Sequence, residues 1–243
     1  MSTPAHDSKH RQSPADSPAD TPADSPSRGT RRRAKGEQTR RKILSAALKV
    51  MAQEGSRGVT HRAVASEAGV QYSLTTYYFK DIEAMIREAF LQMSEAMQPE
   101  MENMWSIVFR YLGGFSAAQL RKLTVREEVC DQLAQYATDY IFVQITEKPE
   151  GLAVEQIFFS HGRLSPELHR MGAEHRAKLL QPLLELCARF NRTDPEVDAE
   201  LLLVTITALE YRYLGVPVEQ VDREFIHRLM RRHIGWIVGL KRA

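Results

Sequence analysis

The sequence predicts an all-α fold in which a small unit of three helices is followed by a larger helical unit. Three observations predict it: apolar side chains recur at helical spacing, Gly and Pro residues punctuate the segments, and no convincing alternating strand is found. The chain has 243 residues, of which 43% are hydrophobic and 26% are charged. This length and composition allow a large buried core and exclude a collagen-like or wholly disordered chain.

The first three helices are marked by their start and stop residues. The first is expected from about Thr39 to Gly55 and carries apolar side chains at i, i+4, i+7 and i+8, namely Ile43, Ala47, Val50 and Met51. Thr60 is a suitable N-cap for a short second helix, which Gly69 ends. A third short helix is expected at about residues 72–79.

The later helices are longer. Asp81 is expected to cap a fourth helix with an apolar stripe, and Pro99 is expected to end that helix. Pro182 is expected to kink or split the segment that contains it. The further helices are expected at about residues 100–112, 116–122, 126–147, 152–162, 166–190, 195–214 and 222–240.

Charge is distributed unevenly along the chain. The formal net charge of +2 conceals +7 over residues 1–80 and −5 over residues 81–243, and residues 28–80 alone carry +9. A basic N-terminal third on an acidic body suggests a head that binds a polyanion. The charge distribution taken alone favours the other interpretation, in which these charges only form a solvated face of the protein.

The N-terminal segment divides into a tail and an arm. Residues 1–27 contain Pro-Ala-Asp three times in a repeat without large apolar side chains, so we expect a disordered tail. Residues 28–36 are expected to form a mobile basic arm that lies along phosphates or in a minor groove of DNA. A merely solubilising arm remains an equal alternative. The basic stretch continues into the first helix and comprises Arg28, Arg31, Arg32, Arg33, Lys35, Arg40, Arg41 and Lys42.

Several classes of protein are excluded on this evidence. The longest apolar run, Leu201 to Leu209, has nine residues, whereas a membrane span needs roughly 20. Cys130 and Cys187 make neither a disulfide framework nor a metal cluster, and the eight His residues show no clustered ligand spacing. No nucleophile elbow, phosphate loop or other catalytic motif is found. We therefore expect no enzyme, no cofactor and no metal, and a cytoplasmic protein because no secretory signal is found.

The segment 60–80 carries the functional motif. Ala65 and Gly69 are four residues apart; the small Ala allows two helices to cross closely, and the Gly can take the positive φ of a tight turn. Two short helices joined in this way form a helix-turn-helix, whose second helix enters the major groove of DNA. The basic surroundings and an aromatic-rich second helix ending at Phe79 support this interpretation.

Residues 37–86 resemble the N-terminal domain of the TetR family of bacterial transcriptional regulators. The matching residues are Ile43-Leu44-Ser45-Ala46-Ala47, Gly55, Val59-Thr60, Val64-Ala65, Ala68-Gly69-Val70 and Thr76-Tyr77-Tyr78-Phe79. The resemblance implies a homodimer in which three helices bind DNA, a fourth leads to a regulatory domain, and a small ligand there weakens DNA binding. Two positions depart from the family: Thr76 stands where Tyr is usual, and Ile82 where Lys is frequent. Lys80 can replace the phosphate contact of that Lys.

The resemblance and the motif together predict a sequence-specific regulator, most simply a ligand-responsive repressor that binds a palindromic double-stranded DNA operator. A non-specific architectural DNA-binding protein is the alternative. The expected divisions are a tail and arm (1–36), a helix-turn-helix three-helix DNA-binding domain (37–80) and a helical ligand-binding and dimerisation domain (81–243). The residues expected to contact DNA are Thr60, His61, Arg62, Gln71, Tyr72, Ser73, Leu74, Thr76, Tyr77 and Lys80.

The larger helical unit offers candidates for an effector pocket and for a dimer interface. Aromatic residues build such pockets, although ordinary core is the alternative for each; the candidates are Trp105, Phe109, Tyr136, Tyr140 and Phe158. Glu210 is either a polar anchor within an apolar helix or a solvent-facing residue. The homodimer is expected to form through residues 166–190 and 195–214. The expected seam is a stripe of Leu202, Ile206 and Leu209, flanked by Leu203 and Tyr213.

Overall fold

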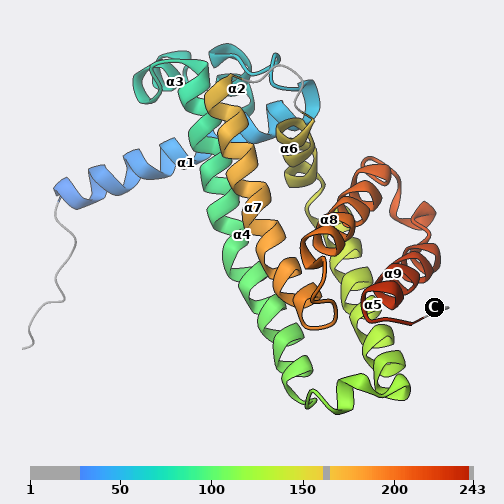
Figure 1. Cartoon of the computed structure of the whole chain (residues 1–243). Coiled ribbons are helices and arrows are strands. Elements are labelled where there is room, and N and C mark those ends of the chain that lie inside the picture. The colour runs from blue at the N-terminus through green and yellow to red at the C-terminus, as the bar shows by residue number, and fades with distance from the viewer. Residues whose placement is uncertain (1–27, 161–164, 241–243) are drawn as a thin grey trace, which may run out of the picture. The chain divides into compact units, whose positions relative to one another are not determined.

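The computed structural model describes residues 28–160 and 165–240, and the expectation of a disordered tail at 1–27 lies outside these residues. Within the described ranges there are α-helices and short 3₁₀ helices but no strand, which confirms the all-α prediction. The elements, shown in Figure 1, are α1 (Arg28–Glu54), α2 (His61–Ala68), α3 (Tyr72–Tyr78), α4 (Ile82–Gly113), η1 (Gln119–Arg121), α5 (Leu123–Glu147), α6 (Pro149–Phe159), α7 (Pro166–Ala188), α8 (Pro195–Arg212), η2 (Val218–Gln220) and α9 (Arg223–Ile237).

The first helix is longer than the sequence predicted. α1 begins at Arg28 rather than near Thr39, so the expected start of the first helix was wrong and residues 28–36 are helical. The role of these residues as an arm that follows DNA stays a prediction. The added residues 28–38 hold Arg, Lys, Glu, Gln and Ala, which are good helix formers, and no Pro, although Gly29, Thr30 and Gly36 are poorer ones. The contact pattern divides the chain into two units, residues 1–37 and residues 38–243.

One apolar cluster forms the core around α2 and α3. It combines side chains of α1, such as Ile43 and Met51, with Val64 of α2 and with Phe79, which follows α3. The same cluster extends beyond residue 80, because Phe90 of α4 stacks on Phe158 of α6 with 3.7 Å between the ring centroids. The core of the three-helix head, defined as residues 38–80, is therefore continuous with α4, α6 and the start of α7.

Two prolines lie inside helices that continue through them. α4 runs from Ile82 to Gly113 across Pro99, so the expectation that Pro99 ends the helix was wrong; α7 likewise contains Pro182 without being split. An internal proline costs a helix about 3 kcal/mol or more. Both helices bury apolar side chains on either side of the proline, and each such burial contributes about 1.5–3 kcal/mol. Tertiary packing thus outweighs the local penalty.

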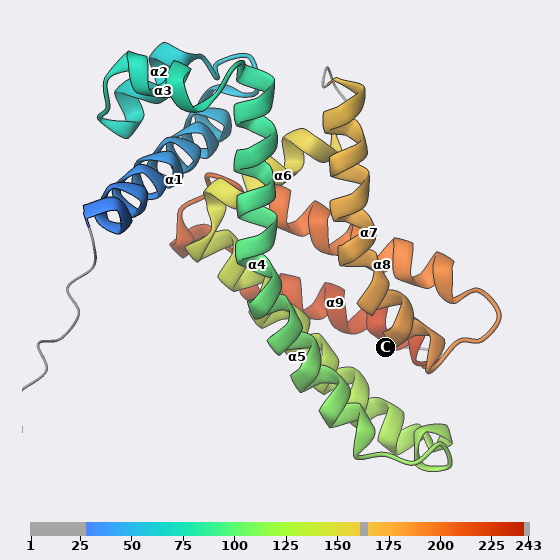
Figure 2. The same ribbon diagram turned by 90° about the vertical axis from the view of Figure 1, so that its left-hand side faces the viewer.

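A second apolar cluster fills the space among α4, α5, α7, α8 and α9. α5 packs along α9, and α7 packs along α8, as Figures 1 and 2 both show. Both cysteines are buried and free. None of the described helices combines the length and the apolar character needed to cross a membrane.

Candidate nucleic-acid interface and internal cavity

The turn between α2 and α3 has the backbone geometry that the sequence predicted. Thr60 caps α2, because its Oγ1 accepts a hydrogen bond of 3.0 Å from the backbone N–H of Ala63. Gly69 ends α2 with φ 59° and ψ 42°, in the left-handed region, where a side chain costs roughly 1–2 kcal/mol. The N–H of Val70 then donates to the carbonyl of Ala65 at 3.0 Å. The cap and the positive φ are both confirmed.

Thr75 fixes which face of α3 points inward. Its side chain is fully buried, and its Oγ1 donates to the carbonyl of Tyr72 at 2.8 Å. Thr75 was not among the residues expected from the sequence to have a role. Its position four residues before the buried Phe79 would have indicated the inner face of the helix.

The outer face of α3 is polar and aromatic. Tyr77 is 79% exposed and Tyr72 is 56% exposed. Leu74 differs from the rest, because it is half-buried and packs against the core cluster of the head. The remaining expected DNA-contacting residues of α3 and its flanks are all exposed, namely Gln71, Ser73, Thr76 and Lys80.

The start of α2 lies beside this face. Thr60 and Arg62 are exposed, whereas His61 is half-buried and makes an edge-on ring contact with Tyr72 at 6.2 Å. The buried Nδ1 of His61 has no hydrogen-bond partner. Together with Val70 and Ile82, these residues line a shallow hollow in the surface. The geometry therefore places a helix N-terminus next to the exposed face of α3.

One residue of the basic stretch serves a structural purpose. Arg40 forms an ion pair with Glu88 of α4, and its guanidinium lies 5.5 Å from the centre of the Phe79 ring. Arg40 thus links α1 to α4.

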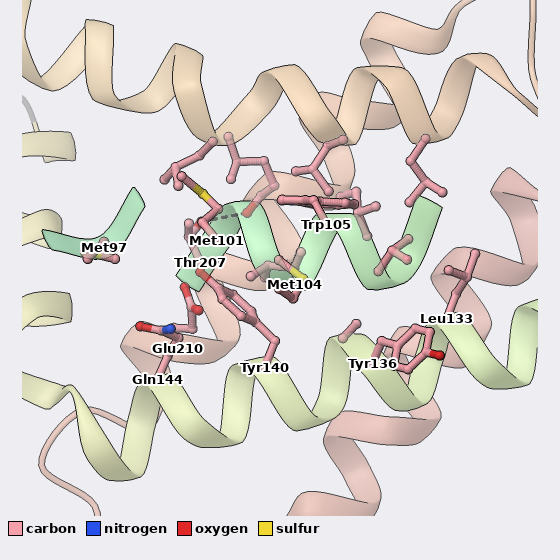
Figure 3. Close-up of a pocket in the computed structure, with 18 of the residues that line it drawn as sticks. Met97, Met101, Met104, Trp105, Leu133, Tyr136, Tyr140, Gln144, Thr207 and Glu210 are labelled. Carbon is pink, nitrogen blue, oxygen red and sulfur yellow. Dashed lines mark hydrogen bonds between the residues drawn. The ribbon is translucent and has the colours of Figure 1, made fainter. Parts of the chain in front are cut away.

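The larger part of the molecule contains a cavity lined by six helices. Figure 3 shows that side chains from α4, α5 and α8 converge on it. Its lining residues are Met97, Met101, Met104, Trp105, Val108, Leu133, Tyr136, Ala137, Tyr140, Gln144, Leu152, Glu155, Leu179, Leu183, Leu186, Leu202, Leu203, Ile206, Thr207, Glu210 and Ile234.

Three of the five aromatic candidates are among these lining residues: Trp105, Tyr136 and Tyr140. Phe109 and Phe158 lie elsewhere. Phe109 stacks on Trp105 and lies under the guanidinium of Arg189, whereas Phe158 stacks on Phe90 in the head cluster. Both side chains therefore bury their apolar surface against other residues and do not face the cavity.

Glu210 faces the cavity and not the solvent. Its side chain is 2% exposed, and its Oε1 is buried without a hydrogen-bond partner. Burial, and after it the charge of Glu155, raise the pKa of Glu210 well above its ordinary value. Of the two alternatives that the sequence left open, the structure selects the buried polar position.

A chain of buried hydrogen bonds joins four helices at one end of the cavity. Ser94 Oγ of α4 lies 3.0 Å from His175 Nδ1 of α7, and His175 Nε2 lies 3.1 Å from Glu155 Oε2 of α6. Tyr211 of α8 donates its hydroxyl to Glu155 Oε1 at 3.0 Å. These four residues, defined here as the polar chain, connect the cavity wall to α4. Sequence reasoning missed the polar chain because its members are far apart in the sequence.

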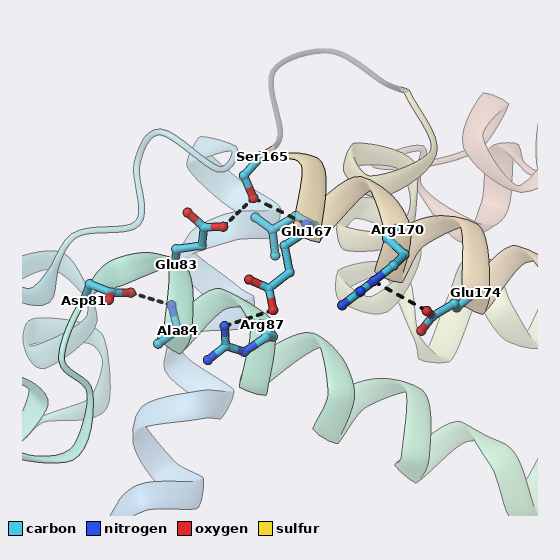
Figure 4. A network of polar contacts seen from close by, with 9 residues as sticks. Asp81, Glu83, Ala84, Arg87, Ser165, Glu167, Arg170 and Glu174 are labelled. Carbon is cyan, nitrogen blue, oxygen red and sulfur yellow. Dashed lines mark hydrogen bonds and ion pairs between the residues drawn. The ribbon is translucent and has the colours of Figure 1, made fainter.

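A second set of contacts joins the first turns of α4 and α7, as Figure 4 shows. Arg87 pairs with Glu167 at 3.2 Å, and Ser165, the N-cap of α7, donates to Glu83. Asp81 caps α4 through the N–H of Ala84 at 2.7 Å, as expected. These contacts tie the helix that follows the head to α7. In the part of the chain that the structure describes, no group of three or more potential metal ligands is found.

Comparison with known proteins gives the identity of the head. Residues 43–89 match a family model described as bacterial regulatory proteins, tetR family. A comparison with curated proteins gave no match.

Solved structures of similar fold cover most of the chain. A transcriptional regulator from Rhodococcus sp. RHA1 has 19% identity and a TM-score of 0.61 over 82% of this chain and 95% of its own. A TetR-like regulator from the same organism has 14% identity and a TM-score of 0.56 over 85% and 97%. The multidrug binding protein EbrR, complexed with ethidium, has 23% identity and a TM-score of 0.50 over 81% and 98%. Residues 43–89, with the helix-turn-helix geometry of α2 and α3, therefore match the N-terminal domain of the TetR family of bacterial regulatory proteins, and the chain shares the all-α fold of these solved structures.

Proposed function

We propose that this TetR-family regulator is a ligand-responsive repressor that binds a palindromic operator as a homodimer. The observation that carries the proposal is the orientation of α3. Thr75 is buried on the inner side, while Gln71, Thr76 and Tyr77 are exposed on the outer side. A helix held in this way presents a continuous polar face to a major groove.

The exposed residues divide by chemistry into two roles. Gln71 can pair with adenine, and the methyl group of Thr76 can contact the methyl group of thymine, so these side chains are proposed to read bases. Thr60 at the α2 N-terminus, Tyr77 and Lys80 are proposed to bind phosphates, because a helix N-terminus, a hydroxyl and an ammonium group all favour an anion.

A different apolar surface from the expected one supports the homodimer. The predicted seam was wrong, because Leu202, Leu203 and Leu209 are buried within the protomer. The exposed apolar row of α8 consists instead of Val197, Leu201 and Val204, spaced i, i+4 and i+7, with Trp236 exposed on α9. We propose that α8 and α9 of two protomers pack together through this row, defined as the apolar row. Exposed apolar patches of this kind mark interaction sites.

The cavity supports the response to a ligand. Its wall includes five residues of α4, the helix that directly follows the head. A ligand inserted there acts on DNA binding only if it binds one arrangement of α4 better than another. The complex of EbrR with ethidium is consistent with a small-molecule site in this fold.

The test is a salt series of binding to the promoter DNA next to the coding sequence and to random DNA. A regulator of this kind binds its specific DNA about 10³-fold or more tighter than random DNA. Equal affinity for both DNAs would instead indicate the architectural alternative, and absence of binding to either would reject DNA binding altogether.

A further inference from the structure

We propose that the internal cavity binds an organic cation, an ammonium or amidinium group on an aromatic or aliphatic body, with Glu210 as its counter-ion. This inference rests on the proposed function only in that the bound cation would be the effector. The binding site itself depends only on the residues of the cavity.

An unpartnered oxygen lies at the wall of the cavity. Glu210 Oε1 is buried at the wall of the cavity and receives no hydrogen bond, although the side chain is 98% removed from solvent. A buried carboxylate oxygen without a partner is costly. A ligand that brings a positive N–H or an onium group into the cavity removes that cost.

The charged side chains that line the cavity are all acidic. Among the described lining residues there are two carboxylates, Glu155 and Glu210, and no Lys, Arg or His. Glu155 already accepts hydrogen bonds in the polar chain, from Tyr211 and from the ring of His175. Glu210 is therefore the acid left available to a ligand, and an anionic ligand would meet repulsion without any compensating cation.

Aromatic and sulfur-containing side chains make up much of the remaining wall. Trp105, Tyr136 and Tyr140 line the cavity together with Met97, Met101 and Met104. The faces of aromatic rings attract cations. Methionine side chains are flexible and polarisable, so they can move aside for the apolar body of a ligand. A second hollow between α4 and α5 is lined by the same three methionines.

Cation binding is expected to release a proton. In the free protein, burial and the charge of Glu155 raise the pKa of Glu210, which favours its protonated form. A bound cation favours the ionised form. The other titratable groups near it are Tyr140 on α5, Tyr211 beside it on α8, and His175 on α7 through Glu155. Affinity for a permanent cation should therefore rise with pH until Glu210 is ionised in the free protein.

The test compares two ligands of the same shape. Phenyltrimethylammonium is a permanent cation, and tert-butylbenzene is its neutral isostere. Isothermal titration calorimetry of the full-length wild-type protein should show the cation binding about tenfold tighter or more. The Glu210→Gln variant should lose this preference, whereas Glu95→Gln, which removes an equal charge from an exposed position of α4, should keep it.

A second measurement needs no variant. Between about pH 5 and pH 8 the affinity of the wild-type protein for the cation should rise, while its affinity for tert-butylbenzene should stay constant. Equal binding of the two ligands, a preference that survives in Glu210→Gln, or a cation affinity that does not change with pH would each overturn the proposal.

Promoter DNA binding, measured on the same preparations without ligand, separates this inference from the proposed function. If specific DNA binding is present and the cation preference is absent, the ligand class is wrong while the regulator stands. If the cation preference is present and specific DNA binding is absent, the cavity assignment stands and the proposed function fails.

Discussion

His175 Nε2 lies 3.1 Å from Glu155 Oε2, and both side chains are almost completely buried. His175 is held from its other side by Ser94 of α4, at 3.0 Å from Nδ1. Because Glu155 also lines the cavity, the polar chain is a continuous connection from the cavity wall to the helix that follows the head. A ligand in the cavity can therefore act on α4 through this connection, in addition to direct contact with the α4 side chains that line the cavity.

The polar chain should contribute to stability. Ser94→Ala leaves the buried Nδ1 of His175 without its partner, and the free energy of unfolding should fall by about 1–3 kcal/mol. Urea unfolding followed by circular dichroism measures this change. Ser66→Ala, at an exposed position of α2, is the matched control and should change stability by no more than about 0.5 kcal/mol. Equal effects of the two substitutions would show that the polar chain does not contribute to the free energy of unfolding.

The exposed Tyr77 should position the protein on DNA without reading its sequence. Tyr77→Phe removes the hydroxyl group while keeping the ring, so affinity for promoter DNA and for random DNA should fall by similar factors. Fluorescence anisotropy with both DNAs at one salt concentration measures this. A loss confined to the promoter DNA would assign Tyr77 to base recognition instead.

The apolar row should hold the dimer together. Leu201 and Val204 are 52% and 53% exposed in the protomer, so Leu201→Glu should leave the protomer folded while placing a buried charge in the interface. Light scattering at micromolar concentration should then show a dimer for the wild type and a monomer for the variant. Leu123→Glu, a change at an exposed leucine at the start of α5, should remain dimeric; a monomeric wild type would reject the interface outright.

The two thiols should be unreactive in the folded protein. Burial raises the pKa of the Cys130 thiol to about 11 and that of Cys187 to about 12, and only the thiolate reacts as a nucleophile. Labelling with a thiol reagent at neutral pH should therefore be slow until the protein is denatured, when both cysteines react. Rapid labelling of the native protein would show that α5, which carries Cys130, or α7, which carries Cys187, opens readily.

Local signals in the sequence predicted the head well. The cap at Thr60, the left-handed Gly69 and the cap at Asp81 each depend on a single residue and its immediate backbone, so they could be read directly. The start of α1 and the passage of α4 through Pro99 could not. These boundaries depend on intrinsic helix preference and on distant packing that override a local stop signal.

The candidate cavity was less predictable, for a physical reason. Tyr140 and Trp105 were identified as candidates because they are aromatic. Phe158 is aromatic as well, but it packs in another cluster. Residue type shows that a side chain is buried and not what it faces. The role of Glu210, and the polar chain that brings Glu155 to His175, depend on four helices meeting, which no local pattern records.

The most direct test of the central claim is selection of binding sites from random double-stranded DNA, with the wild type and with a variant carrying both Gln71→Ala and Thr76→Ala. The wild type should select an inverted repeat whose half-site centres are about one helical turn, roughly 34 Å, apart. The double variant should select a repeat with the same spacing but altered bases, because each lost base contact costs about 1–3 kcal/mol of discrimination. Recovery of the same bases by both proteins, or of no motif by the wild type, would contradict sequence reading by α3.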